Sequence, residues 1–302
     1  NFYKILLKNR KESVDKMQEY TDKYLIKCKN NNNCKRILEQ SKIAIDQHHY
    51  NLQNKYLWYC FTPKIGKILN IPSTIMRESF SNKNYNLYCF WTGDNEMTEN
   101  RKKAYQSIVD NSKANVILVT PNNLNNYLIE PLHPAYKYLS NVHKSDYLRW
   151  YFMHYYGGGY SDIKHMNFSW VQYFEKLEKS DKLAIGYKEI NGGIASSNPE
   201  VVKNYDKVFG MCLFIYKPNN NITKEWGVKL HNILDNKLEL LKKNPSSFNR
   251  DHHNAKIPNT NKKSKYPLAW AEILGSILHN ILYKYKNNIL LDMPLVNTNN
   301  YI

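Results

Sequence analysis

Residues 145–165 read SDYLRWYFMHYYGGGYSDIKH, a pattern that predicts a helix, a glycine turn and a strand in succession. The helix is expected to begin near Ser145, whose hydroxyl can cap it, and to reach Tyr156. At about 100° per residue its apolar side chains share one face, whereas Asp146 and Arg149 lie on the opposite face. The glycines then end the helix, because glycine adopts the left-handed backbone conformation at little cost.

The order of these elements argues against a nucleotide-binding phosphate loop. Such loops run from a strand through glycines into a helix, so that the helix N-terminus faces the anion. Here the helix comes first, and its C-terminus faces the turn. The turn instead leads into a predicted strand over about residues 160–163, which brings Asp162 to a sheet end near Asp146 and Arg149.

The surrounding chain has the pattern of an α/β domain from Tyr85 onward. Residues 86–91 and 115–120 are predicted strands, and a helix is predicted between them over residues 97–112. This alternation indicates a parallel sheet, whose ligands bind at the carboxyl ends of the strands, and Trp91 follows one such end. Further strands are expected over 182–190, 193–197 and 212–218, and further helices over 223–244 and 268–285.

Residues 1–84 are predicted to form an N-terminal helical segment, and residues 85–302 the main domain. The segment has charged residues at helical spacing but too few apolar positions for a core of its own. We expect a helical hairpin that packs on the main domain. A stalk, a peripheral membrane contact or a partner-binding element is the alternative.

The charge and the cysteine content limit which partners and which cellular compartment are expected. The formal net charge of +17 favours anionic partners such as nucleotide sugars, acidic glycans, lipid head groups or nucleic acid, without choosing among them. The five cysteines have no paired spacing, and no apolar run is long enough to span a bilayer. We therefore expect a cytoplasmic protein, peripheral to a membrane at most, or one of the host cytoplasm if its source is a virus.

The same stretch resembles the Ser-Asp-x-x-Arg and Gly-Gly-x-Tyr-x-Asp-x-Asp signature of sugar-nucleotide transferases with the DXD motif. That group includes glycosyltransferase family 32, related capsular-polysaccharide and large-virus enzymes, and the glucosylating domains of clostridial toxins. CFWTGDNEMTENR (89–101) is similar to their first strand and loop, and YPLAWAEILGSILH (266–279) to the Trp-x-Glu-Ile element of the capsular and viral branch. The resemblance covers about residues 85–285 and implies a GT-A fold, a Rossmann-like mixed sheet flanked by helices.

Carried over by position, the resemblance assigns the nucleotide base to the end of the first strand. Trp91 would stack on the base, with Thr92 and Gly93 in the same binding loop, and Asn122 would contact it. Each residue also has a simpler interpretation. Trp91 can be a core residue, and Asn122 lies in a Pro-Asn-Asn turn, where asparagine is common.

For the sugar and the diphosphate, the resemblance implies roles for four residues of the stretch 145–165. Asp146 would accept hydrogen bonds from donor-sugar hydroxyls, Arg149 would hold the sugar or a phosphate, Tyr160 would line the diphosphate, and Asp162 would be the first acid of the DXD motif. The alternative for Asp146 and Arg149 is a surface ion pair three residues apart, worth only about 0.2–0.5 kcal/mol. Tyr160 can equally serve packing.

The C-terminal element is expected to complete the site. Trp270 and Glu272 would shape the donor or acceptor side, although a helix start with a core tryptophan explains them nearly as well. Relatives often carry arginine before this tryptophan, whereas this chain has Ala269, so its acceptor or phosphate contacts are expected to differ.

Lys164 stands where the family pattern has its second aspartate. Mn²⁺ or Mg²⁺ binds in such sites through carboxylate and diphosphate oxygens, and an ammonium group cannot be a ligand. Three alternatives follow. In the first, Asp162 holds the metal with help from His165 or from the histidines of the DHH sequence, of which His253 is the preferred candidate. In the second, Lys164 and Arg149 replace the metal electrostatically. In the third, the enzyme is inactive. Histidines in such polar loops are ordinarily surface residues.

The sequence thus predicts a retaining glycosyltransferase that moves a sugar from a nucleotide-sugar donor to a glycan acceptor. A UDP-sugar is favoured and a GDP-sugar is possible, and no nucleic acid partner is expected. No protein nucleophile is evident, so the acceptor hydroxyl is expected to attack from the leaving-group side, with the diphosphate taking its proton. The alternative is an inactive transferase fold that binds acidic glycan or nucleic acid.

Overall fold

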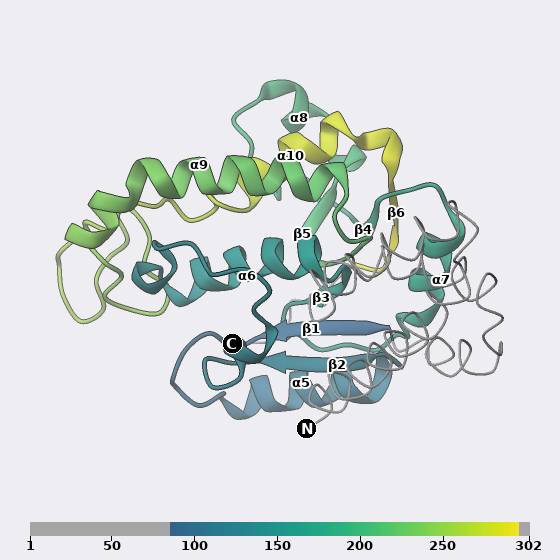
Figure 1. Ribbon diagram of the computed structural model, residues 1–302, viewed down its shortest axis with the longest axis horizontal. Helices are drawn as coiled ribbons and strands as arrows, with labels where there is room; N and C mark the ends of the chain where they lie inside the picture. Colours follow the sequence, from purple (N-terminus) through teal and green to yellow (C-terminus); the bar gives the residue numbers. More distant parts are fainter. Residues whose placement is uncertain (1–84, 296–302) are drawn as a thin grey trace, which may run out of the picture. The chain divides into compact units, whose positions relative to one another are not determined.

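The computed structural model describes residues 85–295, and the predicted helical segment 1–84 lies outside these residues. Strands and helices alternate along the described chain (Figure 1). The strands are β1 (Asn86–Phe90), β2 (Asn115–Val119), β3 (Gly158–Ser161), β4 (Ala184–Lys188), β5 (Phe209–Tyr216) and β6 (Ile289–Met293). The α-helices are α5 (Glu99–Asn111), α6 (Asn141–Tyr155), α7 (Val171–Lys179), α8 (Pro199–Lys203), α9 (Asn221–Lys243) and α10 (Gly275–Lys284).

The described strands form one mixed sheet in the order β2-β1-β3-β5-β4-β6. β1 is parallel to β2 and β3, and β4 is parallel to β6. β5 runs antiparallel to both of its neighbours, β3 and β4. The parallel pairing expected from the alternation of elements is confirmed for β1 and β2, whereas β5 enters the sheet in the opposite direction. The mixed α/β sheet flanked by helices, as the resemblance implied, is confirmed and fits a GT-A-like fold.

Helices cover both faces of the sheet because alternate strand residues point to opposite sides. Leu87 and Cys89 of β1 belong to a buried cluster with residues of α5 and α7. Tyr88 and Phe90 lie on the other face, where their ring centroids are 4.8 and 5.1 Å from that of Phe152 in α6. α9 lies against α6, and α10 lies against α9 (Figure 1).

Helix α6 differs from its prediction in two ways. It begins at Asn141, one turn earlier than expected, because the Ser140 hydroxyl is the N-cap and accepts a hydrogen bond from the His143 backbone N–H. It is also buried on nearly all sides, since the sheet packs on one side and α9 on another. Asp146 is only 3% exposed, so the helix face that carries it is buried as well.

Two other predictions are wrong because side chains accept hydrogen bonds from backbone N–H groups in these segments. Residues 193–197 are not a strand, since the Ala195 N–H donates to Nδ1 of His279 in α10 at 3.0 Å. The helix predicted over 268–285 begins only at Gly275, after turns in which Glu272 accepts from the Ala269 N–H. The remaining predicted strands and helices are confirmed within a few residues, whereas α7, α8 and β6 were not predicted.

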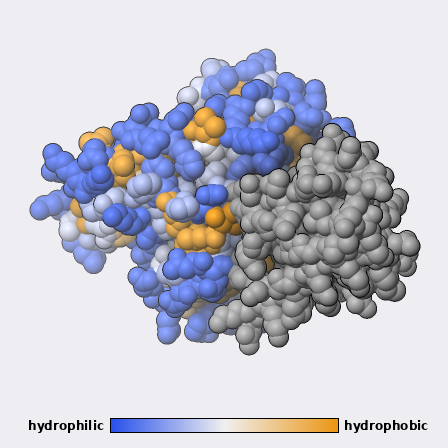
Figure 2. Space-filling view, viewed as in Figure 1, coloured by the Kyte–Doolittle hydropathy of each residue, from blue (hydrophilic) through white to orange (hydrophobic). Residues whose placement is uncertain are grey.

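The surface in view is mainly hydrophilic, with hydrophobic residues confined to a few small patches (Figure 2). Among the described helices, none combines the length and apolar character that crossing a membrane requires.

Gly157 and Gly192 provide a matched test of the turn between α6 and β3. Both have positive φ, at 62° and 82°. A Cβ at Gly157 would lie 2.8 Å from the Tyr216 carbonyl oxygen, whereas one at Gly192 would meet nothing within 4 Å. Gly192→Ala is expected to lower the free energy of unfolding by about 1 kcal/mol, and Gly157→Ala by about 2–4 kcal/mol, because only the latter adds a backbone clash. Urea unfolding measures both, and equal losses would contradict the tight turn.

Candidate active site

A cavity of about 400 Å³ lies among the described residues at the carboxyl ends of β1 and β3. Its walls come from the loop after β1, the N-terminal turns of α5 and α6, the end of β3, and a loop before α10. The lining residues are Phe90, Trp91, Thr92, Gly93, Asn95, Thr98, Arg101, Asn141, Val142, Ser145, Arg149, Tyr160, Asp162, Ile163, Asn249, Arg250 and Trp270. The volume is within the usual range for a small-molecule site.

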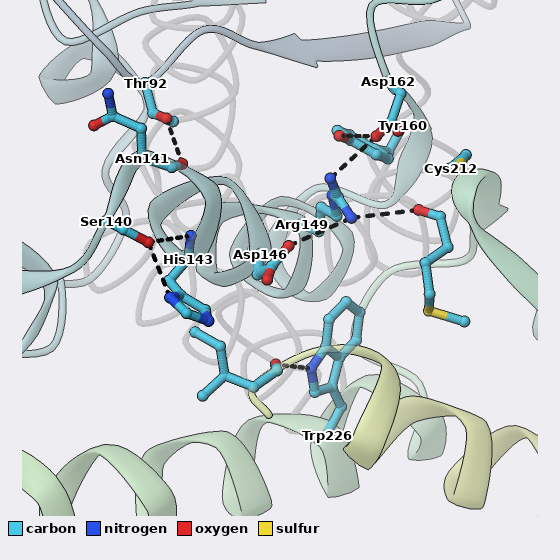
Figure 3. Close-up of polar contacts among 12 residues, drawn as sticks. Thr92, Ser140, Asn141, His143, Asp146, Arg149, Tyr160, Asp162, Cys212 and Trp226 are labelled. Carbon is cyan, nitrogen blue, oxygen red and sulfur yellow. Dashed lines mark hydrogen bonds and ion pairs between the residues drawn. The ribbon is translucent and has the colours of Figure 1, made fainter. Parts of the chain in front are cut away.

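Arg149 connects the two predicted acids at the base of this cavity (Figure 3). Its Nη2 lies 3.0 Å from Oδ1 of Asp162, and its Nη1 lies 3.4 Å from Oδ1 of Asp146. The Tyr160 hydroxyl donates to the same Asp162 oxygen at 2.7 Å, and the guanidinium carbon lies 4.5 Å from the centre of the Tyr160 ring. The surface ion pair considered for Asp146 and Arg149 is therefore excluded, because both side chains are buried.

The two carboxylates have different electrostatic surroundings. Burial raises the pKa of Asp146 to about 7, although Arg149 opposes the shift. Burial also acts to raise the pKa of Asp162, but Arg149 and Lys164 together hold it below its ordinary value. Asp162 is therefore ionised near neutral pH, whereas Asp146 gains and loses its proton there.

Lys164 lies behind Asp162 and does not line the cavity. Its Nζ is 3.2 Å from Oδ2 of Asp162 and 3.0 Å from Sγ of Cys212, and the residue is only 6% exposed. The backbone fixes this arrangement, since the Asp162 N–H donates to the Cys212 carbonyl at 2.7 Å and the Lys164 N–H to the Asp162 carbonyl at 2.8 Å. Lys164 thus acts on the site through Asp162.

The loop after β1 is tied to the start of α6. The Trp91 indole N–H donates to the Asn95 carbonyl at 2.6 Å, and the Thr92 hydroxyl donates to the Asn141 carbonyl at 2.6 Å. A Cβ at Gly93 would lie 2.5 Å from Asn141 and from Asn95 side-chain atoms, so this position leaves little room for any other residue. The three predicted residues Trp91, Thr92 and Gly93 all line the cavity.

Trp270 lines the cavity and is 42% exposed, so it is not a core residue. The Arg250 guanidinium carbon is 5.3 Å from the centre of its ring. Glu272 does not line the cavity; it lies 2.5 Å from the Lys237 ammonium group and accepts from the Ala269 N–H at 2.8 Å. Among the residues of this element, the structure thus places Trp270 at the cavity and gives Glu272 a structural role.

The cavity also contains residues that the sequence did not single out. Arg101 of α5 donates from Nη1 to the Ile163 carbonyl at 2.6 Å and so holds the chain next to Asp162. Asn249 and Arg250 come from a polar loop with no motif of its own. Arg101 lies within the stretch that resembles the family's first strand and loop, whereas nothing in the sequence indicates Asn249 or Arg250.

The other predicted base and metal contacts lie away from the cavity. Asn122 is exposed in the turn after β2 and does not line the cavity. His165 and His253 are exposed as well, and no three His, Cys, Asp or Glu side chains among residues 85–295 are grouped to hold a metal ion. The structure therefore does not bring Asp162, His165 and His253 together.

The donor set around Asp162 does not fit a divalent cation. Both carboxylate oxygens already contact positively charged groups, Arg149 on one side and Lys164 on the other. The buried Nε of Arg149, which has no hydrogen-bond partner among the described residues, is a donor and suits an anion.

The pKa of Asp146 predicts a pH dependence of stability. In the unfolded chain this group loses its proton near pH 4, whereas the folded protein retains it until about pH 7. Between these values the folded state binds more protons, so Asp146 makes the free energy of unfolding fall as pH rises, by up to about 1.4 kcal/mol per pH unit. Urea unfolding across this range should show the fall in the parent relative to Asp146→Asn, and a constant difference would contradict the raised pKa.

Comparison with known proteins gives two findings. The family model described as "Capsular polysaccharide synthesis protein" matches residues 35–163, a span of less than half of the chain that includes Asp146, Arg149 and Asp162. Solved structures that match include "PaToxG Glycosyltransferase", at 15% identity and a TM-score of 0.35, covering 53% of this chain and 64% of that chain, less than two thirds of its length. No curated protein matches. The family match supports a glycosyltransferase-like protein.

Proposed function

We propose that the protein is a retaining glycosyltransferase that takes a sugar from a nucleotide-sugar donor and transfers it to a glycan acceptor. The observation that carries the proposal is the composition of the cavity. It combines three arginines with one carboxylate and two indoles, those of Trp91 and Trp270. Guanidinium groups suit phosphate oxygens and indoles suit a nucleotide base, so this set of side chains matches a nucleoside diphosphate with a sugar attached.

We assign each region of the cavity a part of the donor. Trp91 stacks on the base, because it follows β1 at the sheet edge where nucleotides bind in α/β folds. Arg149 lies near the diphosphate at the end of β3, with Asp162 and Tyr160 fixing the plane of its guanidinium group. The sugar then extends toward Trp270, where the acceptor enters.

The chain's own residues stabilise the departing diphosphate electrostatically. In a retaining transfer the sugar becomes oxocarbenium-like while negative charge develops on the leaving oxygen. Arg149 is held in place before the reaction by two carboxylates, so little reorganisation is needed as that charge grows. The acceptor hydroxyl attacks from the leaving-group side, and the diphosphate takes its proton.

A panel of sugar nucleotides tests this function. The protein is incubated with UDP- and GDP-sugars, with and without a glycan acceptor, and free nucleoside diphosphate is measured. One donor is expected to release its nucleotide, faster with acceptor than without, and NMR of the product should show retained anomeric configuration. Absence of both binding and release across the panel would contradict the proposal, and steeply salt-dependent binding of acidic glycan alone would support an inactive binding protein.

A further inference from the structure

We propose that this cavity binds the diphosphate of its nucleotide through arginine side chains, without a divalent cation. The proposal rests on the function proposed above and concerns the same cavity. Four observations carry it: the contacts of Asp162, the nature of the residue two positions later, the charge balance of the cavity lining, and an arginine that packs on Trp270 at the cavity.

The first observation is that each carboxylate oxygen of Asp162 already contacts a positively charged side chain. Oδ1 lies 3.0 Å from Arg149 and accepts from Tyr160, while Oδ2 lies 3.2 Å from Lys164. A divalent ion at either oxygen would stand within a few ångströms of one of these positive groups. Repulsion at that distance in a partly buried site opposes the ligation that a single carboxylate could provide.

The second observation is the position of Lys164 itself. Its ammonium group is a buried, fixed positive charge held by Asp162 and by the sulfur of Cys212. A lysine ammonium group carries a positive charge at neutral pH. Lys164 therefore gives Asp162 the positive partner that a metal ion would otherwise provide.

The third observation is that the lining carries more positive than negative charge. Arg101, Arg149 and Arg250 all line the cavity, and Asp162 is the single carboxylate among the described lining residues. Arg149 contacts Asp162, which is ionised near neutral pH, and Asp146, whose pKa is raised to about 7, so only part of its charge is balanced inside the protein. Arg250 has no carboxylate partner among residues 85–295, so its charge is available to a ligand.

The fourth observation is that Arg250 is held at the cavity before a ligand binds. We call Asn249, Arg250 and Trp270 the lip. Asn249 accepts from the Asn141 amide at 2.9 Å and donates to the Asn95 side chain at 3.3 Å, which ties the lip to the loop after β1. Arg250 itself lies over the Trp270 ring at 5.3 Å.

A buried histidine fixes the other half of the lip. His143 is fully buried, and its Nε2 donates to the Ala269 carbonyl, next to Trp270, at 3.0 Å. Burial lowers the pKa of His143 to about 4, so the ring is neutral and one nitrogen carries the proton for this bond. The lip therefore places Arg250 at the cavity that Asp162 also lines, and a guanidinium group can donate two parallel hydrogen bonds to phosphate oxygens.

Calorimetry of the intact chain tests the proposal. UDP and GDP are titrated in excess EDTA and, separately, in excess Mn²⁺. One of them is expected to bind with the same Kd in both solutions. Arg250→Gln should raise the Kd of that nucleotide about tenfold in EDTA. It should leave binding of the matching nucleoside unchanged, because only the diphosphate contacts the guanidinium group. Lys256 is an exposed lysine of the same loop that does not line the cavity, so Lys256→Gln should change the Kd of neither the nucleotide nor the nucleoside.

The outcomes separate this proposal from the proposed function. Binding that appears only in Mn²⁺ would overturn metal-free recognition while leaving a nucleotide-dependent enzyme. An equal loss of nucleotide affinity in Arg250→Gln and Lys256→Gln would overturn the role of the lip, since such a loss would depend only on the overall charge of the protein. If neither nucleotide binds in either solution, the proposed function fails and this inference fails with it.

Discussion

Arg149→Met is expected to lower the free energy of unfolding by about 3–5 kcal/mol and to abolish nucleotide binding, because it leaves the buried Asp146 and the partly buried Asp162 without their shared positive partner. Methionine fills a similar volume, so the loss reports the missing charge and its hydrogen bonds more than a cavity. Urea unfolding and calorimetry with UDP and GDP measure the two effects separately.

The matched control is another cation three residues from its carboxylate on a helix. Lys102 contacts Glu99 at 2.9 Å on α5, and both side chains are exposed. Lys102→Met should have no measurable effect on stability or on nucleotide binding, because solvent already screens that pair. The double variant Arg149→Met/Asp146→Asn should recover part of the stability but none of the binding. Similar losses for Arg149→Met and Lys102→Met would contradict the central place of Arg149.

Asp162→Asn is expected to reduce turnover of the active donor by at least about 100-fold, because it removes the charge that holds Arg149 and Lys164 in place. The amide keeps the size of the side chain and can still accept from Tyr160, so the site is expected to keep its shape. Nucleotide release at saturating donor measures turnover, and thermal unfolding measures stability in the same samples.

A second substitution separates the catalytic from the structural effect of Asp162. Asp162→Asn leaves the buried Lys164 without its carboxylate, so it should also be less stable. Asp162→Asn/Lys164→Met should regain stability and remain inactive, since Arg149 is still unsupported. Full turnover by Asp162→Asn in an otherwise active preparation would mean that the reaction takes place elsewhere.

Much of the fold was predictable because local signals agree with the tertiary structure. Thr98 caps α5, Gly157 and Gly158 after α6 have positive φ, and alternating residues of β1 face opposite helical layers. β6 was missed because Ile289–Met293 is a short apolar run next to a helix, without a flanking motif. Its pairing with β4, distant in the sequence, is what makes it a strand.

The candidate site was predictable only where it follows strand ends. Trp91 and Asp162 come directly after β1 and β3, so topology alone brings them to one edge. The burial of Asp146 was not predictable, because it depends on α9 and on packing around the whole of α6. Arg250 reaches the cavity through side-chain contacts of Asn249 with distant asparagines, which no local pattern encodes.

A crystal structure with the nucleoside diphosphate that binds, grown in the presence of Mn²⁺, tests the central claim most directly. The account predicts the base beside Trp91, phosphate oxygens within hydrogen-bonding distance of Arg149 and Arg250, and no anomalous manganese signal at Asp162. A nucleotide bound outside this cavity, or a manganese ion between Asp162 and the diphosphate, would contradict it.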